Sequence, residues 1–466
     1  MIFSSCDNIG SFAKFEQDFL DDNMLVMVYI AGANSLQNEV VMDINSMEKG
    51  LFVARKKGFL KLKVVALVDK YSSVGSESWT GTRLYEITPN NTDSSSGKIH
   101  SKIINTASNS LGTWRDNANK EEDMGNIKTL ENFILWATEN YPDYKKHSLI
   151  LWNHGGGVYS DYKPSYFICT DNESGKTSES LDNALYIGEI SELLEKYYSK
   201  ENSLEFLGFD ACFMGLYEVA YQFRNYAKYM AFSPATEWGG WNYEYIFGKF
   251  DSCQSGKNFA INVVDGYKEA YNNQYPNTMT AVDLQFASEL KEKIDKLSER
   301  LGEELISDKV SMREIMEKVK NNSILMHPKD DNKLSSLILC YPYYELGSLL
   351  RCFANQNTTL KNDNGIIFSN PIASASFEVQ EELKKMIIKT WLGGDYGKIY
   401  PSESTTYPYG ISIFFSNKNN FYYHGFYSSE KTGTNGVLGY GNIEAANKTD
   451  NGKIDTWYEL QCALYE

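Results

Sequence analysis

The sequence predicts a layered α/β protein with a mostly parallel central sheet. An apolar run from Met24 to Ala31 is followed by a segment of helical period, Asn38 to Ala54, and by a second apolar run, Leu62 to Val68. Two later apolar runs, SLILW ending at Trp152 and LEFLGF ending at Phe209, are each followed by small or polar residues. Buried strands that alternate with amphipathic helices are typical of βαβ units, in which the strands run parallel.

The other elements follow from the same patterns. Alternating or continuous apolar stretches bounded by turn residues predict further strands, and a charged segment of helical period predicts a solvated helical region. We expect strands at Thr82–Ile87, Tyr229–Ser233, Thr278–Leu284, Ser335–Tyr341 and Gly410–Phe415, and helices at Ile127–Glu139 and within Lys291–Lys320.

The totals restrict the class of protein. With 466 residues, of which 42% are hydrophobic, the chain can bury a large core. We expect an N-terminal tail (1–22), one large α/β domain (23–290) and a C-terminal α+β module packed on it (291–466). A net charge of −16 argues against nucleic-acid binding. No C-x-x-C and no H-E-x-x-H occurs, so zinc ribbons and zincins are excluded. We expect no transmembrane segment and a monomer.

A thiol stands directly after one of the buried strands. The run that ends at Phe209 continues as Asp210-Ala211-Cys212, and helical spacing begins after it. Open α/β sheets place their chemistry at the carboxyl ends of strands, which favours Cys212 as a nucleophile. A buried, inert cysteine is the alternative, because free cysteines are among the most buried residues.

A second strand end supplies the base that such a thiol needs. His154 follows the run ending at Trp152 and precedes three glycines. An imidazole beside a thiol can take its proton and later protonate a leaving amine. Gly155 lets its backbone N–H approach a reacting carbonyl, and with the N–H of Cys212 it can form an oxyanion hole. The pattern predicts a cysteine hydrolase with a Cys212–His154 dyad.

At these residues the chain resembles the clostripain family of cysteine peptidases, which belongs with caspases, gingipains and legumain. The resemblance rests on WNHGGG and GFDACFMG, in that order, and on weaker matches: MLVMVYIAGANSL, Asp123-Met124-Gly125, Gly240-Trp241 with Tyr243, and YPYGISIFFS. It implies a caspase-like α/β/α sandwich and peptide or protein substrates.

The resemblance also implies specificity and maturation. In the family, the Asp of Asp-Ala-Cys lines the pocket for the P1 side chain and selects Arg or Lys. Here that residue is Asp210, and Glu237 is a candidate for a second negative charge. A helix cap is the alternative role for Asp210. Several relatives cut themselves after a basic residue between the His and Cys strands. Lys163 and Lys176 are the candidates here, and solvated surface lysines are the alternative.

Two other functions compete. The HGGG run at His154 matches the oxyanion motif of esterases, but no serine has glycine at both −2 and +2, so an esterase is disfavoured. The second is a peptidase-like surface binding module that has lost activity. The presence of His154, Cys212 and Asp210 at their motif positions argues against it.

Location and cofactors stay open. Small residues before Cys6 resemble the end of a bacterial lipoprotein signal, although a charged n-region and a full apolar h-region are missing. A secreted or envelope protein lipidated at Cys6 and a cytoplasmic protein are both compatible with this. No cofactor is required. Calcium binding is possible but has no assigned site. The segment Asn447–Glu459 resembles a calcium loop, yet two of its expected ligand positions hold Thr449 and Tyr458.

Overall fold

The computed structural model places most of the chain. It describes residues 23–58, 61–72, 77–91, 97–104, 122–157, 167–171, 184–250, 254–326, 342–354, 369–394, 396, 409–416, 443–446 and 452–465.

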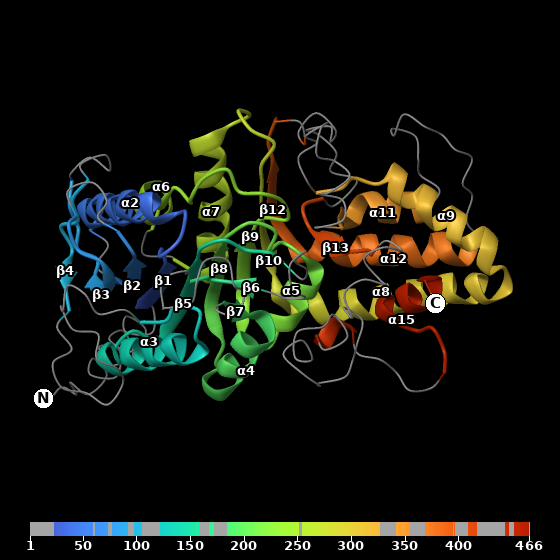
Figure 1. Cartoon of the computed structure of the whole chain (residues 1–466), viewed down its shortest axis with the longest axis horizontal. Helices are drawn as coiled ribbons and strands as arrows, with labels where there is room; N and C mark the ends of the chain where they lie inside the picture. Colours follow the sequence, from blue (N-terminus) through green and yellow to red (C-terminus); the bar gives the residue numbers. More distant parts are fainter. Residues whose placement is uncertain are drawn as a thin grey trace, which may run out of the picture.

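Within the described residues, one sheet of nine strands forms the centre of the molecule (Figure 1). Its order is β12-β10-β9-β8-β5-β1-β2-β3-β4. The strands are β1 (Met24–Ala31), β2 (Leu62–Lys70), β3 (Gly81–Glu86), β4 (Lys102–Ile103), β5 (Lys146–Trp152), β8 (Leu204–Asp210), β9 (Ala227–Phe232), β10 (Thr278–Asp283) and β12 (Ile387–Leu392).

The middle of the sheet is parallel and its two margins are antiparallel. β2, β1, β5, β8 and β9 pair in parallel. β3 and β4 extend one margin, and β10 and β12 the other, with antiparallel pairing. The predicted α/β fold with a mostly parallel sheet is therefore confirmed.

The central strands are largely buried and mostly apolar because helices cover both faces of the sheet. In β1, Leu25, Met27 and Tyr29 face one hydrophobic core, while Met24, Val26 and the alternate residues that follow face another. Strands buried on both sides read as continuous apolar runs.

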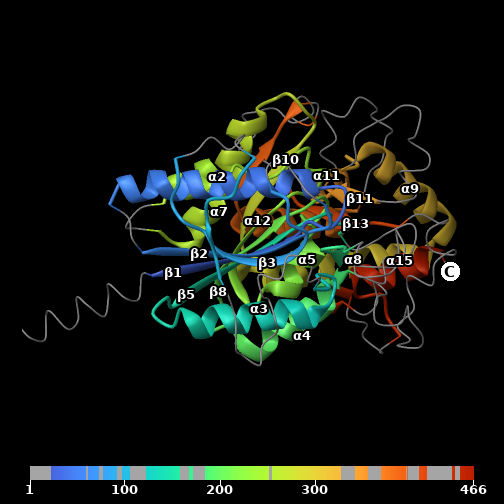
Figure 2. The same cartoon turned by 60° about the vertical axis from the view of Figure 1, so that its left-hand side comes forward.

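Two sets of helices make these layers, and Figures 1 and 2 show them on opposite sides of the sheet. One side carries α2 (Gln37–Lys56), α6 (Tyr243–Gly248) and α7 (Gly256–Tyr271). The other carries α3 (Ile127–Asn140), α4 (Ile187–Tyr197) and α5 (Tyr217–Phe223). The arrangement is the α/β/α sandwich that the sequence predicts.

The C-terminal part of the chain contributes a helical layer and the edge strand β12. Its elements are α8 (Ala287–Ser307), α9 (Lys309–Asn322), β11 (Tyr343–Glu345), α11 (Leu346–Phe353), α12 (Asn370–Met386), β13 (Ser412–Phe414) and α15 (Trp457–Tyr465). β11 and β13 form a separate antiparallel pair. Because β12 joins the main sheet, this part is continuous with the large domain, and the predicted division at residue 290 stays a prediction.

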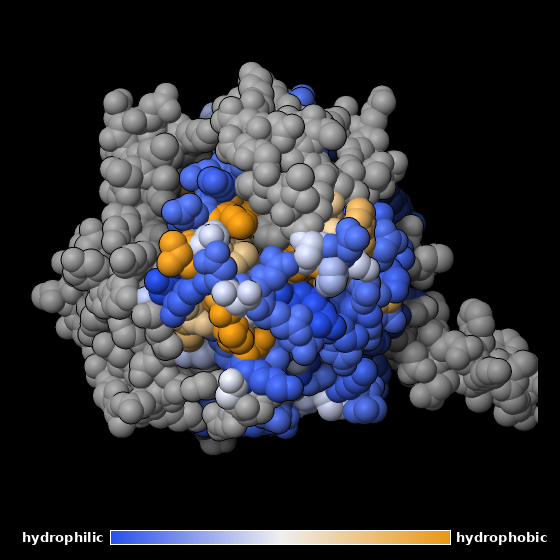
Figure 3. Space-filling view, turned by 90° about the vertical axis from the view of Figure 1, so that its right-hand side faces the viewer, coloured by the Kyte–Doolittle hydropathy of each residue, from blue (hydrophilic) through white to orange (hydrophobic). Residues whose placement is uncertain are grey.

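The charged segment predicted at 291–320 is two helices rather than one. α8 ends before Asp308 and α9 begins after it. The side chain of Asp308 accepts a hydrogen bond from the backbone N–H of Ser311 at 3.1 Å and so caps α9. Figure 3 views this end of the molecule, where the described surface is mainly hydrophilic with a few hydrophobic groups. Ile306 and Val310, on either side of the break, are exposed apolar residues.

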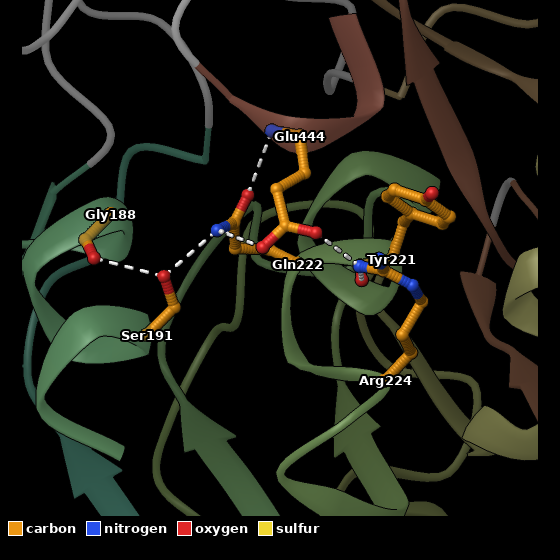
Figure 4. A network of polar contacts seen from close by, with 6 residues as sticks. All are labelled: Gly188, Ser191, Tyr221, Gln222, Arg224 and Glu444. Carbon is orange, nitrogen blue, oxygen red and sulfur yellow. Dashed lines mark hydrogen bonds and ion pairs between the residues drawn. The ribbon is translucent and has the colours of Figure 1, made fainter. Parts of the chain in front are cut away.

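A polar network fastens the segment 443–446 to α4 and α5 (Figure 4). Glu444 accepts hydrogen bonds from Arg224, at 2.6 Å, and from Gln222, at 3.4 Å. The backbone N–H of Glu444 donates to Gln222, which in turn donates to Ser191. Glu444 is thus joined to Gln222 and Arg224, more than 200 positions earlier in the chain, at the end of α5, the helix that follows the predicted nucleophile.

Candidate active site

The two predicted reactive residues lie beyond neighbouring strand ends at the same level. In the parallel pair of β5 and β8, Trp152 is the register partner of Asp210. His154 and Cys212 each stand two residues further along, and the backbone N–H of Asn153 continues the pairing by donating to the carbonyl of Asp210 at 3.2 Å. The equal offsets bring the two turns together at one edge of the sheet.

Close backbone contact joins these two turns. A Cβ at Gly155 would lie 2.4 Å from the carbonyl oxygen of Cys212 and 3.0 Å from the Cβ of Ala211. Only glycine leaves room for this approach. The turn after the nucleophile is tight as well, since Phe213 has a φ of 60°. Its N–H donates to the carbonyl of Ala235 at 3.0 Å, which holds the turn in place.

Cys212 is half-buried and carries its proton at rest. The backbone N–H of Glu237 donates to its Sγ at 3.3 Å. Burial, together with the charges of Glu237 and Asp210, raises the pKa of the Cys212 thiol to about 12, although the hydrogen bond from the Glu237 N–H acts in the opposite direction. The thiol therefore needs a base in order to react.

His154 faces a serine in this structure. Its Nε2 lies 2.8 Å from the Oγ of Ser35, in the loop between β1 and α2, and no hydrogen bond joins the imidazole to the described Sγ of Cys212. Burial lowers the pKa of His154. A neutral imidazole at physiological pH is the form that can accept a proton from a thiol.

Asp210 is buried beside the nucleophile and does not cap a helix. Its Oδ2 accepts hydrogen bonds from the hydroxyl of Tyr243 at 2.7 Å and from the backbone N–H of Trp241 at 3.3 Å. α5 has Leu216 at its N-cap and no side-chain cap. Burial raises the pKa of Asp210 to about 7, while the hydrogen bonds from Tyr243 and Trp241 lower it.

Two more carboxyl groups join Asp210. Both oxygens of Glu237 are buried and neither accepts a hydrogen bond of ordinary geometry. Asp43, on α2, accepts from the indole N–H of Trp152 at 2.8 Å. Burial raises the pKa of both carboxyl groups well above the usual range, and the charge of Asp210 adds to this. Asp43, Asp210 and Glu237 thus form a buried acidic cluster, in which Asp210 and Glu237 adjoin Cys212 and Asp43 adjoins Asp210.

An exposed aromatic pair borders this cluster. Trp238 follows Glu237, is 47% exposed and stacks on Tyr275 with ring centres 5.4 Å apart. Its backbone N–H donates to the hydroxyl of Tyr267 at 3.2 Å. The loop from Pro234 to Trp241 therefore walls the region around the thiol, as its place in the sequence suggests.

The C-terminal part braces both turns. Tyr343, on β11, donates to the carbonyl of Gly156 at 2.5 Å, and the backbone N–H of Ser412, on β13, donates to the carbonyl of Gly215 at 2.9 Å. Phe414 donates to the buried carboxylate of Glu218 at 2.9 Å. Residues far along the chain therefore hold the loops that carry His154 and Cys212.

Several predicted residues lie outside the described part of the chain: Cys6, Lys163 and Lys176, together with the first five positions of Asn447–Glu459. Lipidation, location and self-cleavage therefore stay predictions. In the described end of Asn447–Glu459, the carboxylate of Glu459 accepts hydrogen bonds from the N–H groups of Asp455 and Thr456. The N–H of Glu459 donates to the hydroxyl of Thr456 in return, so the two residues form a capping box at the start of α15. Among the described residues no three His, Cys, Asp or Glu side chains are placed so that they could hold a metal ion. No helix there is long and apolar enough to cross a bilayer.

The fold and the site define a hydrolase whose nucleophile is a cysteine. The sequence model of the clostripain family matches residues 28–451. The chain is 27% identical to the clostripain of Hathewaya histolytica, over 94% of this chain and 86% of that protein. The chain therefore belongs to the clostripain family of cysteine peptidases.

Solved structures show the same fold. A secreted C11 cysteine protease from Bacteroides thetaiotaomicron, in complex with an irreversible peptide inhibitor, matches with a TM-score of 0.57 at 18% identity, covering 91% of this chain and 99% of that one. An inactive zymogen C11 protease from Parabacteroides distasonis matches with a TM-score of 0.53, also at 18% identity, covering 84% and 92%. The predicted caspase-like architecture is confirmed.

The acidic cluster predicts an unusual pH dependence of stability. A buried carboxyl with a raised pKa keeps its proton when folded, whereas the unfolded chain loses it above about pH 4.5, so stability falls as pH rises above that value, by about 1.4 kcal/mol per pH unit for a fully linked proton. Glu237→Gln removes this linkage. We expect the variant to melt about 2–4 °C above the wild type at pH 8 and level with it at pH 5, as measured by calorimetry.

The exposed Glu139 provides the matched control. Glu139→Gln is expected to leave the melting temperature unchanged at both pH values. A Glu237→Gln variant that is less stable than the wild type at pH 8 contradicts the prediction.

Proposed function

We propose that the protein is an endopeptidase that cleaves after basic residues, with Arg preferred to Lys at P1. One observation carries this proposal: three buried carboxyl groups, without a cation beside them among the described residues, lie next to the thiol of a cysteine peptidase. Burial and mutual repulsion make these carboxyl groups costly to ionise unless a counter-charge is present. A P1 guanidinium or ammonium group supplies that counter-charge when substrate binds.

Glu237 and Asp210 form the specificity pocket in this proposal. Asp210 stands two residues before Cys212, within reach of the side chain that precedes the scissile bond. A planar guanidinium can pair with a carboxylate through two hydrogen bonds, whereas an ammonium is a point charge, which favours Arg. The unpartnered oxygens of Glu237 offer a second acceptor.

Acyl transfer follows from the arrangement of the two turns. His154 takes the proton of Cys212 as the sulfur attacks the carbonyl carbon of the scissile bond. The N–H groups of Gly155 and Cys212 stabilise the oxyanion. His154 then passes the proton to the departing amine as the C–N bond breaks, which leaves an acyl-enzyme thioester. Water, deprotonated by His154, hydrolyses the thioester and restores the thiol.

A panel of fluorogenic peptides tests this function. Four substrates that differ only in P1, namely Arg, Lys, Leu and Asp, are compared before and after alkylation with iodoacetamide. The proposal expects turnover in the order Arg, Lys, then the neutral residue, and loss of all turnover on alkylation. A folded, stable protein without turnover of any peptide favours the inactive binding module instead.

We also propose self-cleavage between the two catalytic turns, after Lys163 or Lys176. The stretch between these lysines is tied to the active site. Gly155 forms a β-bridge with Ile168, and Asp171 accepts from the N–H of Met124 at 2.8 Å. Cleavage on either side therefore leaves residues 167–171 anchored.

The intact mass after incubation at neutral pH gives the outcome. We expect the wild type to be cut after one of the two lysines and to give two chains under denaturing conditions. Cys212→Ala is expected to keep the mass of the full chain. Lys163→Ala and Lys176→Ala, made singly, identify the site. Cleavage that persists in Cys212→Ala contradicts self-processing.

A further inference from the structure

We propose that Ser35 is a positioning residue for His154. Its hydroxyl holds the imidazole through Nε2 and so leaves Nδ1 as the nitrogen that exchanges protons with Cys212 and the leaving amine. The inference rests on the proposed acid–base role of His154.

The contact between the two side chains is direct. Ser35 Oγ and His154 Nε2 are 2.8 Å apart, which is a hydrogen bond of good length. Among the described residues no carboxylate or backbone carbonyl forms a hydrogen bond with the imidazole, so the hydroxyl is its polar partner there. A hydroxyl can donate to or accept from a ring nitrogen, and the role proposed here uses the tautomer in which Nε2–H donates to Ser35, so that Nδ1 is left to accept a proton.

A pair of buried asparagines explains why Ser35 lies there. Asn34 and Asn153 immediately precede Ser35 and His154, and their side-chain amides donate to the same two carbonyls. Asn34 reaches Ala31 at 2.9 Å and Thr170 at 3.1 Å. Asn153 reaches them at 2.5 Å and 2.9 Å. The serine and the histidine are therefore each one residue away from a common anchor.

The asparagines also set the backbone of both loops. The Oδ1 of Asn34 accepts from the N–H of Leu36 at 2.9 Å, which forms an Asx turn around Ser35. The Oδ1 of Asn153 accepts from the N–H of His154. Both amides are almost fully buried, with 1% and 3% of their surface exposed. The backbones that carry Ser35 and His154 are thus held to each other through two buried amides, while the hydroxyl of Ser35 itself is exposed.

The proton inventory is consistent with this role. In the neutral ring, Nε2–H donates to the oxygen of Ser35 and the lone pair of Nδ1 is free. Nδ1 takes the thiol proton to form the imidazolium, whose Nε2–H still has its acceptor. Nδ1–H then protonates the amine, which returns the ring to its starting tautomer. Ser35 gains and loses no proton.

Ser35→Ala tests the inference. Loss of one orienting hydrogen bond is expected to lower kcat about tenfold, with the KM for a P1-Arg peptide unchanged within twofold. Ser35→Thr keeps the hydroxyl and is expected to restore kcat to within about threefold of the wild type. Ser199→Ala, which removes another exposed hydroxyl bonded to an acidic side chain, Glu201, is the matched control and should behave as the wild type.

Nitrogen NMR of protein with labelled histidines provides a readout that a purely structural role would not move. The chain has five histidines, so the His154 signals can be assigned by comparison with His154→Ala. We expect Nε2–H in the wild type and a mixture of tautomers in Ser35→Ala. An unchanged or increased kcat in Ser35→Ala, or a threonine variant no better than alanine, overturns the inference. Wild-type turnover that is insensitive to His154→Ala overturns the proposed function instead.

Discussion

Replacing Cys212 with alanine is expected to abolish peptide hydrolysis, with a loss in kcat of at least about 10⁴-fold. The side chain is the sole nucleophile in the proposed reaction, and the remaining backbone donors and pocket supply only binding and oxyanion stabilisation. The measurement is turnover of a P1-Arg peptide by the wild type and the variant after both have been incubated under self-cleaving conditions. His154→Ala is expected to lose a similar factor because the two residues act as a unit.

Cys462 provides the matched control, since it is also a half-buried cysteine but lies on α15. Cys462→Ala should retain full turnover, and alkylation should still abolish that turnover. The expected loss leaves at most about 0.01% of the wild-type activity in Cys212→Ala. A residual activity above about 1% of the wild type would contradict the assignment of the nucleophile.

Asp210→Asn is expected to lower kcat/KM for a P1-Arg peptide about 100-fold at pH 8, in the range for truncating one member of a buried charge pair. The amide still fills the space between Tyr243 and Trp241 but carries no charge. The activity toward a P1-Leu peptide should stay within about threefold of the wild type, because an apolar residue makes no ion pair. Equal losses for both peptides would place Asp210 in the architecture rather than in specificity.

The same residue predicts how binding depends on pH. Because the pKa of Asp210 is raised to about 7 by burial, its carboxyl is neutral below that value and charged above it. The affinity for a cation should therefore rise as pH increases through 7. Competitive inhibition by a small aryl amidine separates the titration of Asp210 from that of His154, because the amidine binds as a cation and its binding needs no proton transfer by His154. We expect tighter inhibition at pH 8 than at pH 6 in the wild type and a flat profile in Asp210→Asn.

The sequence predicted the central sheet because its strands are buried on both faces. β1 is apolar throughout, and β5 and β8 are mostly apolar. His154 and Cys212 stand two residues beyond the ends of β5 and β8, so the proposed dyad followed from strand position and residue chemistry. An apolar run does not encode its direction, however. The antiparallel margins at β3 and β10 depend on pairing partners, and β12 joins the sheet from more than 100 residues beyond β10.

The acidic cluster was predicted in part. Asp210 and Glu237 were identified, but Asp43 was not. Its signal was available, since Asp43 is an acid among Val40, Val41 and Ile44 on the buried side of a helix. Sequence period shows that such a residue faces the core, yet only the fold shows that the core at that point adjoins the nucleophile.

Ser35 and its asparagines were beyond sequence reasoning for a different reason. Asn153 precedes His154 in the sequence, but nothing in the pattern assigns it a role. Asn34 and Ser35 lie in a polar turn whose composition is typical of any loop. Their importance comes from Thr170, whose carbonyl joins two loops that are 119 residues apart in the chain.

The protonated state of the resting sulfur has a consequence for the lifetime of the enzyme. Peroxides and other oxidants attack thiolates far faster than thiols, and the first product, a sulfenic acid, leads on to irreversible sulfinic and sulfonic forms. With its pKa raised to about 12 by burial, Cys212 offers these oxidants almost no thiolate at neutral pH. The resting thiol should therefore react slowly with oxidants, as with iodoacetamide, compared with the thiolate that forms when His154 takes its proton.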